Sequence, residues 1–255
     1  MYLSLNCIAL KTVRYSDRNS ILSVYTRQAG RMSLLVPAGT GRSASRLRAL
    51  LMPLGRFDCV ADIRPGRDIH SFRDVRPVVL PPAADPLKAS LAMFVTEMLN
   101  GLLREAQSDP HLFDYIDRSL RLLAALGKVG AMSGDGVEYP LTAGQLCNFH
   151  ICFLMGLSRF LGIEPDWGSY REGCFFDLAG GVFVAAQPPH RHFLPPGEAA
   201  AAYQLSRMTF RNSGHFKMSR FYRNLVLDRI LLYFQTHFPS LPEPTSLTIL
   251  RMMAD

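Results

Sequence analysis

The stretch that decides the fold of the first part of the chain is Ile21–Val36, which reads ILSVYTRQAGRMSLLV. Two short apolar runs, Ile21–Thr26 and Met32–Val36, flank the segment Arg27–Arg31. Gly30 can adopt the positive φ of a tight turn without steric cost. The stretch therefore predicts two antiparallel strands joined as a hairpin.

Similar apolar runs on both sides of this hairpin complete a pattern of five strands. Leu3–Leu10 precedes the hairpin, and Phe57–Ile63 and Ile69–Val79 follow it. The segment Ser45–Leu51 predicts a short helix between the third and fourth strands. Five short strands and one helix in residues 1–80 predict an OB-fold, a Greek-key barrel that binds single-stranded nucleic acid.

The sequence after Val79 has a helical period. Pro81–Pro86 predicts a linker into a helix that Asp85 caps and Pro86 begins. Helical spacing predicts further helices, with an irregular insert at 168–196. We therefore expect an α+β multidomain chain, an N-terminal OB-fold barrel (1–80) followed by an all-α helical bundle (81–255). The helices are expected over 86–103, 110–126 with Gly127 as stop, 142–161, 218–237 and 246–252.

Positive charge is concentrated in the first domain. Residues 1–80 hold 13 Lys or Arg against 5 Asp or Glu, whereas residues 81–255 hold 15 against 16. A localised basic excess favours a polyanionic partner, nucleic acid before an anionic membrane. No run approaches the roughly 20 apolar residues that span a bilayer, and the five cysteines are widely spread. We expect a cytosolic protein with reduced thiols.

The cations of the first domain form the predicted DNA-binding site. At strand ends and in a glycine loop, long basic side chains can reach phosphates and give sequence-independent, salt-dependent affinity. Tyr2, Tyr15, Tyr25, Phe57 and Phe72 are available for base stacking, although at least half are expected in the core. The predicted DNA-binding residues are Lys11, Arg14, Arg18, Arg27, Arg31, Arg42, Arg46, Arg48 and Arg56.

The glycine loop also leaves an alternative open. The segment Gly39–Ala44 matches G-x-G-x-x-A, and Asp62 lies at nearly the distance expected of a ribose-binding acid. The alternative is a nucleotide-binding enzyme that uses the Gly39/Gly41 loop. It requires a parallel βαβ unit, whereas strands here lead into a bundle. A third alternative is a protein-interaction scaffold, which predicts that neutralising the N-terminal arginines leaves the activity of the protein unchanged.

Two groups of cysteine and histidine residues fall short of the residue sets that metal-binding or catalytic sites require. Cys174, His190 and His192 supply three potential zinc ligands, but the chain has no C-x-x-C pair. A second group lies on an apolar helix, where such residues are more often core than ligands or nucleophiles: Cys147, His150 and Cys152. We expect no catalytic residue, no metal and no cofactor.

A smaller basic group occurs late in the chain, within the slightly acidic second domain. Three cations crowd into seven positions beside aromatic residues, so some cationic and aromatic surface must be exposed. The surface is either a solvated helix face or a groove for an acidic peptide with an aromatic or apolar end. The predicted partner-tail residues are Lys217, Arg220, Tyr222 and Arg223.

Several of these segments resemble one known family, the bacterial RecO recombination mediators. The order, spacing and chemistry agree most strongly in the first domain and more loosely beyond it. The matching segments are Ile8–Thr12 with Tyr15–Arg18, Val24–Arg31, Ser45–Leu54, and Ser219–Arg223 before Tyr233 and His237.

The resemblance implies an OB-fold, a helical second domain and no catalytic turnover. It implies binding to single- and double-stranded DNA, strand annealing, and help to the recombinase RecA in displacing single-strand-binding protein. The implied partners are RecR and the acidic tail of single-strand-binding protein, at the nucleoid in the cytoplasm and not at a membrane. Many members carry a four-cysteine zinc site, of which the region Cys174–Leu178 keeps one cysteine, so no metal is expected.

Overall fold

A computed structural model describes residues 1–37, 39, 41–64, 66–79, 85–104, 107–125 and 143–253. The predicted linker at 81–84 and the predicted stop at Gly127 lie outside these residues, as do the side chains of Ser43, Arg46, Ala143 and Met253. The described residues divide into two compact units: those within 1–138 together with 243–253, and those within 139–242. The expected domain boundary at 80/81 stays a prediction.

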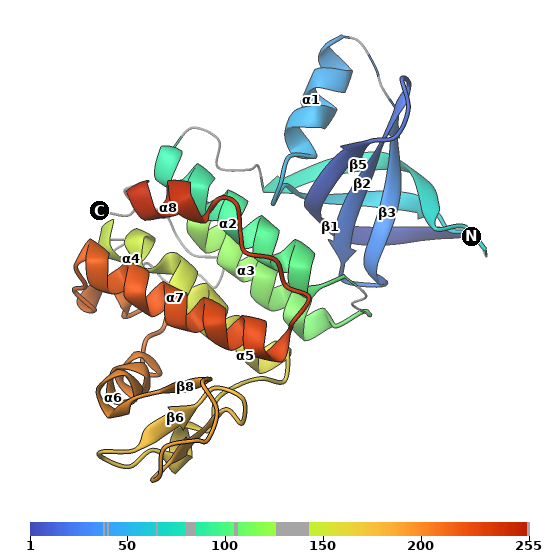
Figure 1. The fold of residues 1–255 in the computed structure, drawn as a ribbon. Coiled ribbons are helices and arrows are strands. Elements are labelled where there is room, and N and C mark those ends of the chain that lie inside the picture. Colours follow the sequence, from blue (N-terminus) through green and yellow to red (C-terminus); the bar gives the residue numbers. More distant parts are fainter. Residues whose placement is uncertain are drawn as a thin grey trace. The chain divides into compact units, whose positions relative to one another are not determined.

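Five strands of the first unit form a closed barrel in the order β1-β2-β3-β5-β4, as predicted for an OB-fold (Figure 1). Neighbouring strands are antiparallel, except for a short parallel pairing of β3 with β5. Gly30 turns the central hairpin at a φ of 68°, as the sequence predicted. The strands are β1 (Tyr2–Arg14), β2 (Asn19–Thr26), β3 (Gly30–Pro37), β4 (Arg56–Asp62) and β5 (Ile69–Val79).

Two β-bulges decide which side chains of the barrel face outward. In β1, Ala9 pairs with Val24 and Lys11 with Ser23, so Leu10 is an extra residue. In β5, two residues lie opposite Cys59 alone, and Asp74 is one of them, at a φ of 55°. Each extra residue shifts the alternation of the strand by one position.

Apolar side chains fill the barrel, and helix α1 (Arg42–Leu50) contributes to one end of that core. The core includes Leu5, Cys7 and Ala9 from β1, and Leu50 and Leu51 from the end of α1 join them. The predicted helix thus exists; it begins three residues and ends one residue earlier than expected.

In the described part of the first unit, three further helices follow the barrel: α2 (Pro86–Leu102), α3 (Pro110–Ala125) and α8 (Leu247–Met253). Asp85 caps α2 by accepting from the backbone N–H of Lys88, and Pro86 opens the helix, as predicted. Asp109 accepts from the N–H groups of His111 and Leu112 at the start of α3. Helix α8 packs on α2, so the end of the chain belongs to the unit of its beginning.

The second unit is helical but carries a small sheet that the sequence did not predict. The insert at 168–196 contains three short strands in the order β7-β6-β8, followed by a helix that was also missed. The elements are α4 (Ala143–Cys147), α5 (Phe149–Phe160), η1 (Trp167–Ser169), β6 (Phe175–Asp177), β7 (Val182–Val184), β8 (Phe193–Leu194), α6 (Pro196–Leu205), η2 (Ser213–His215) and α7 (Arg220–His237).

The helix predicted over 142–161 is two helices separated at Asn148. The Asn148 side chain donates to the carbonyls of Ser213 and Phe216, at 2.8 and 3.0 Å, and accepts from Arg223. Since such side-chain to backbone bonds come from the tertiary fold, the sequence period alone did not reveal the break. Among the described residues, no helix is both long and apolar enough to cross a bilayer.

Candidate nucleic-acid interface and partner site

Arg27, predicted to bind DNA, is bound to a helix of its own unit. Its Nε and a terminal nitrogen donate to the two carboxylate oxygens of Asp114 on α3, at 2.9 and 3.1 Å. The hydrogen bond from Arg27 lowers the pKa of Asp114, and the same pairing raises the pKa of Arg27. A bidentate pair of this kind fixes orientation and occupies the guanidinium.

Arg31 is also held by its own unit. It donates to the carbonyls of Asn100 and Leu103, at 3.1 and 3.3 Å, and to the Asn100 side chain. These carbonyls belong to the C-terminal end of α2, where backbone acceptors lack helical partners and a cation is favoured. Burial lowers the pKa of Arg31, with a smaller contribution from the charge of Arg104.

Among the predicted DNA-binding residues whose side chains the structure describes, Arg56 is the most buried, at 6% exposure. Its Nε donates to Asp117 at 3.0 Å, and a terminal nitrogen donates to Asp58 and to the Phe57 carbonyl. The guanidinium lies 5.1 Å from the ring centroid of Phe113. The folded unit uses donors of Arg27, Arg31 and Arg56 to hold its helices, which argues against phosphate contact by these three residues; their assignment stays a prediction.

Apart from Arg46, the remaining predicted cations are exposed. The β1–β2 turn and α1 lie at the same end of the barrel (Figure 1). The turn carries Arg14 and Arg18, α1 carries Arg42 and Arg48, and Lys11 lies on β1 three residues before Arg14. Arg14 pairs with Asp17 at 2.6 Å and Arg48 donates to the Gly39 carbonyl, yet both remain exposed. The Arg46 side chain lies outside the described residues. The exposed members are Lys11, Arg14, Arg18, Arg42 and Arg48.

Sequence reasoning missed four more exposed cations on the barrel: Arg64, Arg67, Arg73 and Arg76. The bulge at Asp74 lets Phe72 and Val75 both pack on the core while Arg73 and Arg76 face outward. The usable signal was the spacing of three between the two apolar residues, which a regular strand cannot place on one face.

The aromatic side chains divide as expected. Tyr2 and Tyr15 are exposed, at 61% and 64%, whereas Tyr25 and Phe57 are buried and Phe72 packs on the core. The Arg73 guanidinium stacks over the Tyr2 ring at 4.4 Å from its centroid. Tyr2 and Tyr15 are thus the two of the five with rings available to a ligand.

The strand arrangement around the glycine loop differs from that of a dinucleotide-binding fold. The helix after the loop connects β3 to β4, which are not neighbours in the barrel, and no parallel βαβ unit surrounds it in the described residues. Gly41, with a φ of 103°, is the residue before α1. The strand order and the position of Gly41 before α1 therefore favour a helix start over a pyrophosphate-binding loop.

The candidate metal ligands of the second unit do not converge. Cys174 is buried, while His190 lies 3.4 Å from a carboxylate oxygen of Asp177. Across the residues that the structure describes, no group of three or more His, Cys, Asp or Glu side chains is placed to hold a metal ion. Cys147, His150 and Cys152 are buried in the second unit, as core residues are. Burial raises the pKa of Cys152 to about 12, which disfavours a nucleophilic thiolate.

The four predicted partner-tail residues occupy different environments. Lys217, Arg220 and Tyr222 are exposed, at or before the first turn of α7, which Ser219 caps. Arg223 is 6% exposed and donates to Asn148 and to the Met218 carbonyl, each at 3.0 Å. The Arg223 guanidinium holds the start of α7 to the break between α4 and α5, which argues against a contact with a partner tail; the assignment stays a prediction.

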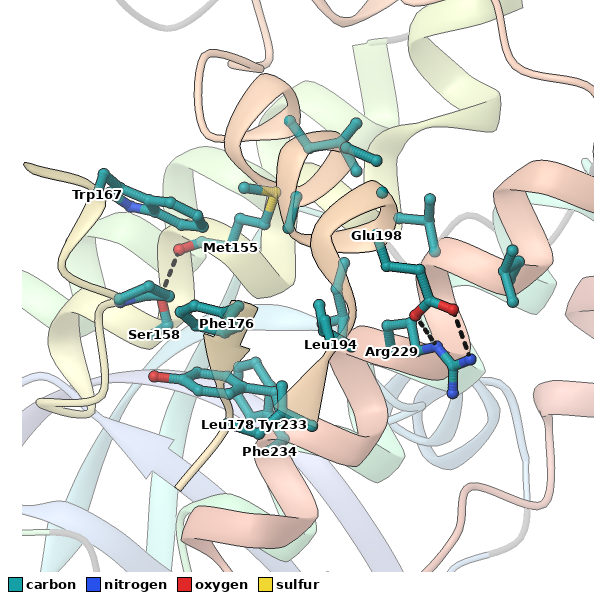
Figure 2. A pocket seen from close by; sticks show the side chains of 18 of the residues that line it. Met155, Ser158, Trp167, Phe176, Leu178, Leu194, Glu198, Arg229, Tyr233 and Phe234 are labelled. Carbon is teal, nitrogen blue, oxygen red and sulfur yellow. Dashed lines mark hydrogen bonds and ion pairs between the residues drawn. The ribbon is translucent and has the colours of Figure 1, made fainter. Parts of the chain in front are cut away.

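Tyr222 of this turn lines an apolar pocket of about 210 Å³. Figure 2 shows the pocket, with Trp167, Phe176 and Tyr233 among its lining residues. Helices α5, α6 and α7 and the small sheet supply its lining, which includes Trp167, Phe176 and Tyr222. Arg229 and Glu198 also line it and form an ion pair with each other at 2.7 Å. The pocket can accept one or two apolar side chains, and its position next to Tyr222 was not foreseeable from sequence.

Comparison with known proteins agrees with this arrangement. Two family models match: recombination protein O, N terminal, over residues 1–80, and recombination protein O, C terminal, over 83–132. A DNA repair protein RecO of Phocaeicola vulgatus is 36% identical over 247 residues, 96% of this chain and 95% of that protein. The DNA repair protein RecO of Porphyromonas gingivalis W83 is 32% identical over 241 residues, 92% of each. The chain belongs to the RecO family of DNA repair proteins.

Membership confirms the resemblance inferred from Ile8–Thr12, Val24–Arg31 and Ser45–Leu54. The stretch matched by the N-terminal model spans the barrel, and the stretch matched by the C-terminal model contains α2 and α3. Both matched stretches fall in the first unit. The second unit, with its pocket, is included through the long matches to whole RecO proteins.

Proposed function

We propose that this RecO-family chain is a non-catalytic recombination mediator that binds single- and double-stranded DNA and anneals complementary strands. In this proposal it works with RecR to help the recombinase load onto DNA coated with single-strand-binding protein. The observation that carries it is the gathering of exposed cations at one end of a barrel, with Tyr15 beside them. Family membership supports the same proposal.

The charge distribution accounts for how such binding would work. Cations on a turn and a helix end contact phosphates without reading bases, so affinity is similar for all sequences. Each neutralised phosphate releases counterions, and the logarithm of the affinity then falls linearly with the logarithm of salt. Annealing suits this mode, because two strands held by their backbones keep their bases free to pair.

Binding of labelled single-stranded and duplex DNA between about 50 and 200 mM salt tests the proposal, together with an annealing assay. The triple variant Arg14→Gln, Arg18→Gln, Arg42→Gln should weaken both affinities and lower the salt slope by about two to three. The control is Arg159→Gln, which removes an exposed cation from the second unit. Unchanged affinity in the triple variant would reject the cationic end as the DNA site.

The tail of single-strand-binding protein is the proposed ligand of the second unit. Lys217 and Arg220 supply charge for an acidic peptide, and the pocket lined by Tyr222 accepts its apolar end. We expect micromolar affinity, roughly 7–8 kcal/mol.

Trp167 is the single tryptophan of the chain and lines the pocket, so its fluorescence reports occupancy directly. An acidic tail peptide should change that emission saturably, and Lys217→Glu with Arg220→Glu should abolish the change while leaving DNA affinity nearly intact. A tail peptide whose last apolar residue is replaced by serine serves as the control ligand. Equal loss of DNA and peptide binding would place the turn in the DNA site instead.

A further inference from the structure

Tyr233 of helix α7 is held in one position by its surroundings. Its hydroxyl donates to the Ile163 carbonyl at 2.7 Å, and the residue is 7% exposed. The ring centroid lies 5.8 Å from that of Phe176 on β6 and 4.5 Å from that of His237. Turning the ring away would break this hydrogen bond and these contacts.

The turn between β6 and β7 approaches the Tyr233 hydroxyl closely. Gly181 in this turn has a φ of 66°, and a Cβ atom added to it would lie 2.9 Å from the hydroxyl oxygen. The N–H of Gly181 donates to the Asp177 carbonyl at 2.9 Å, and its carbonyl accepts from the N–H of Asp166 at 2.8 Å. Gly181 therefore joins the turn to the segment before η1 at a point of contact with α7.

The segments that meet at this contact carry part of the pocket wall. Trp167 follows Asp166 directly, and it lines the pocket together with Phe176 and Leu178 (Figure 2). The rings of Trp167 and Phe176 are nearly parallel, with centroids 6.4 Å apart. Gly181 itself is not among the lining residues. A displacement of the turn relative to α7 would therefore change the pocket indirectly, by moving this wall.

Other contacts of the insert do not involve Gly181. The rings of Tyr170 and Tyr203 stack with centroids 3.9 Å apart, which packs the insert on α6. Tyr170 also meets Phe183 of β7 edge-on, at 5.3 Å between centroids. Since these contacts lie away from the Tyr233 hydroxyl, we expect a change at Gly181 to tilt the small sheet and not to detach it.

We propose that the close approach of Gly181 to Tyr233 sets the position of this wall, so that Gly181 acts as a positioning residue for the apolar end of the bound peptide. The proposal rests on the proposed binding of an acidic tail peptide by the second unit, and it adds to that site a residue that the peptide does not touch. A pocket of about 210 Å³ accepts only one or two apolar side chains, so a displacement of about 1 Å in one wall should lower the affinity.

The test adds a methyl group at two glycines that differ in one respect. Gly181→Ala directs its Cβ at the Tyr233 hydroxyl, whereas a Cβ at Gly173, where φ is 78°, meets nothing within 4 Å. Both variants place alanine at a positive φ, so they share the backbone cost. Tail-peptide affinity, measured by Trp167 fluorescence, should fall about tenfold in Gly181→Ala and less than about twofold in Gly173→Ala. Of these two variants, only Gly181→Ala should shift the emission of the unliganded protein.

A second substitution removes the atom that the new methyl group meets. Tyr233→Phe deletes the hydroxyl, so the double variant Gly181→Ala with Tyr233→Phe should bind the tail peptide within about threefold of Tyr233→Phe alone. Tyr233→Phe loses the hydrogen bond to Ile163 and therefore adds no stability. Recovery of affinity in the double variant thus reports the geometry of the pocket and not the stability of the unit.

Each outcome decides either the ligand or the positioning role. Absence of peptide binding by the original chain rejects the tail as the ligand, and the emission of unliganded Trp167 then decides the positioning role by itself. Equal peptide affinity of the original chain and folded Gly181→Ala rejects the positioning role only. Equal losses in Gly181→Ala and Gly173→Ala, or no recovery in the double variant, also reject it.

Hydrogen exchange of the original chain applies if Gly181→Ala does not fold. The N–H groups of Asp166 and Gly181 are the donors that join the turn to its neighbours. Saturating tail peptide should slow their exchange about threefold or more, because an occupied pocket holds the wall against α7. Unchanged exchange of both groups in the presence of bound peptide overturns the positioning role.

Discussion

Arg56 donates a hydrogen bond from Nε to Oδ1 of Asp117 at 3.0 Å, and this bond ties β4 of the barrel to helix α3. Asp117 also accepts from Arg121, one turn along the helix. A cation that counts toward the basic excess of residues 1–80 is therefore neutralised inside the fold. The excess that can act on a polyanion is smaller than the sequence indicates.

Removing Arg56 should act on stability. Arg56→Ala leaves Asp117 and the Phe57 carbonyl without a buried donor, and the free energy of unfolding should fall by about 3 kcal/mol. Urea denaturation measures the change. Arg48→Ala, at an exposed position, should stay within about 0.5 kcal/mol. An Arg56 variant with native stability and weakened DNA binding would contradict this expectation and would show that Arg56 contacts DNA.

The bulge in β5 gives a second prediction. Asp74 has a φ of 55°, where side chains other than those of Gly, Asn and Asp are disfavoured. Asp74→Val should lower the free energy of unfolding by about 1–2 kcal/mol, whereas Asp74→Gly should leave it nearly unchanged. Thermal unfolding of the two variants compares them at one position. Equal effects would show that the bulge does not constrain the backbone.

Arg223 gives a prediction for the second unit. Arg223→Gln removes the donors that Asn148 and the Met218 carbonyl use, so the unit should lose about 2 kcal/mol of stability. Arg220→Gln, three residues earlier at the surface, is the control. A folded Arg223→Gln protein of normal stability that no longer binds the tail peptide would contradict the structural role and would show that Arg223 contacts the peptide.

His150 makes the stability of the second unit depend on pH. Complete burial lowers the pKa of His150 to about 3, and the charge of Arg223 adds to this. Between pH 3 and about 6.5 the unfolded chain binds a proton that the folded chain refuses, so stability falls as pH falls. We expect a loss of about 1.4 kcal/mol per pH unit below about 6.5. His150→Gln should remove that slope in urea titrations at pH 7.5, 6.0 and 5.0, and His192→Gln should keep it.

Metal content is the fifth prediction. With Cys174 alone remaining from a possible cysteine quartet, the purified protein should contain no stoichiometric zinc, and a chelator should not shift its Tm. Elemental analysis that finds one zinc per chain would overturn this expectation.

The barrel was predictable because its strands are short apolar runs separated by turn residues, and Gly30 fixed the central hairpin. The bulge at Leu10 was not predicted, because the extra residue lies within a continuous apolar run; the bulge at Asp74 was also missed, although the spacing of three between Phe72 and Val75 indicates it. The small sheet of the second unit was missed since its strands have only two or three residues. Residue type identified cations, but whether a cation is exposed depends on partners such as Asp114 and Asp117, which lie far along the chain.

Helix α8 connects the end of the sequence to its beginning through Glu97. The Glu97 carboxylate accepts from the backbone and hydroxyl of Ser246, at 3.0 and 2.8 Å, and from the Thr245 hydroxyl. Residues 139–242 thus lie in the sequence between two parts of the first unit, and its second part, residues 243–253, is synthesised after them. During synthesis, α2 acquires its neighbour α8 only after residues 139–242 have left the ribosome. A nascent chain that stalled within residues 139–242 would hold an unfinished first unit, however complete its barrel.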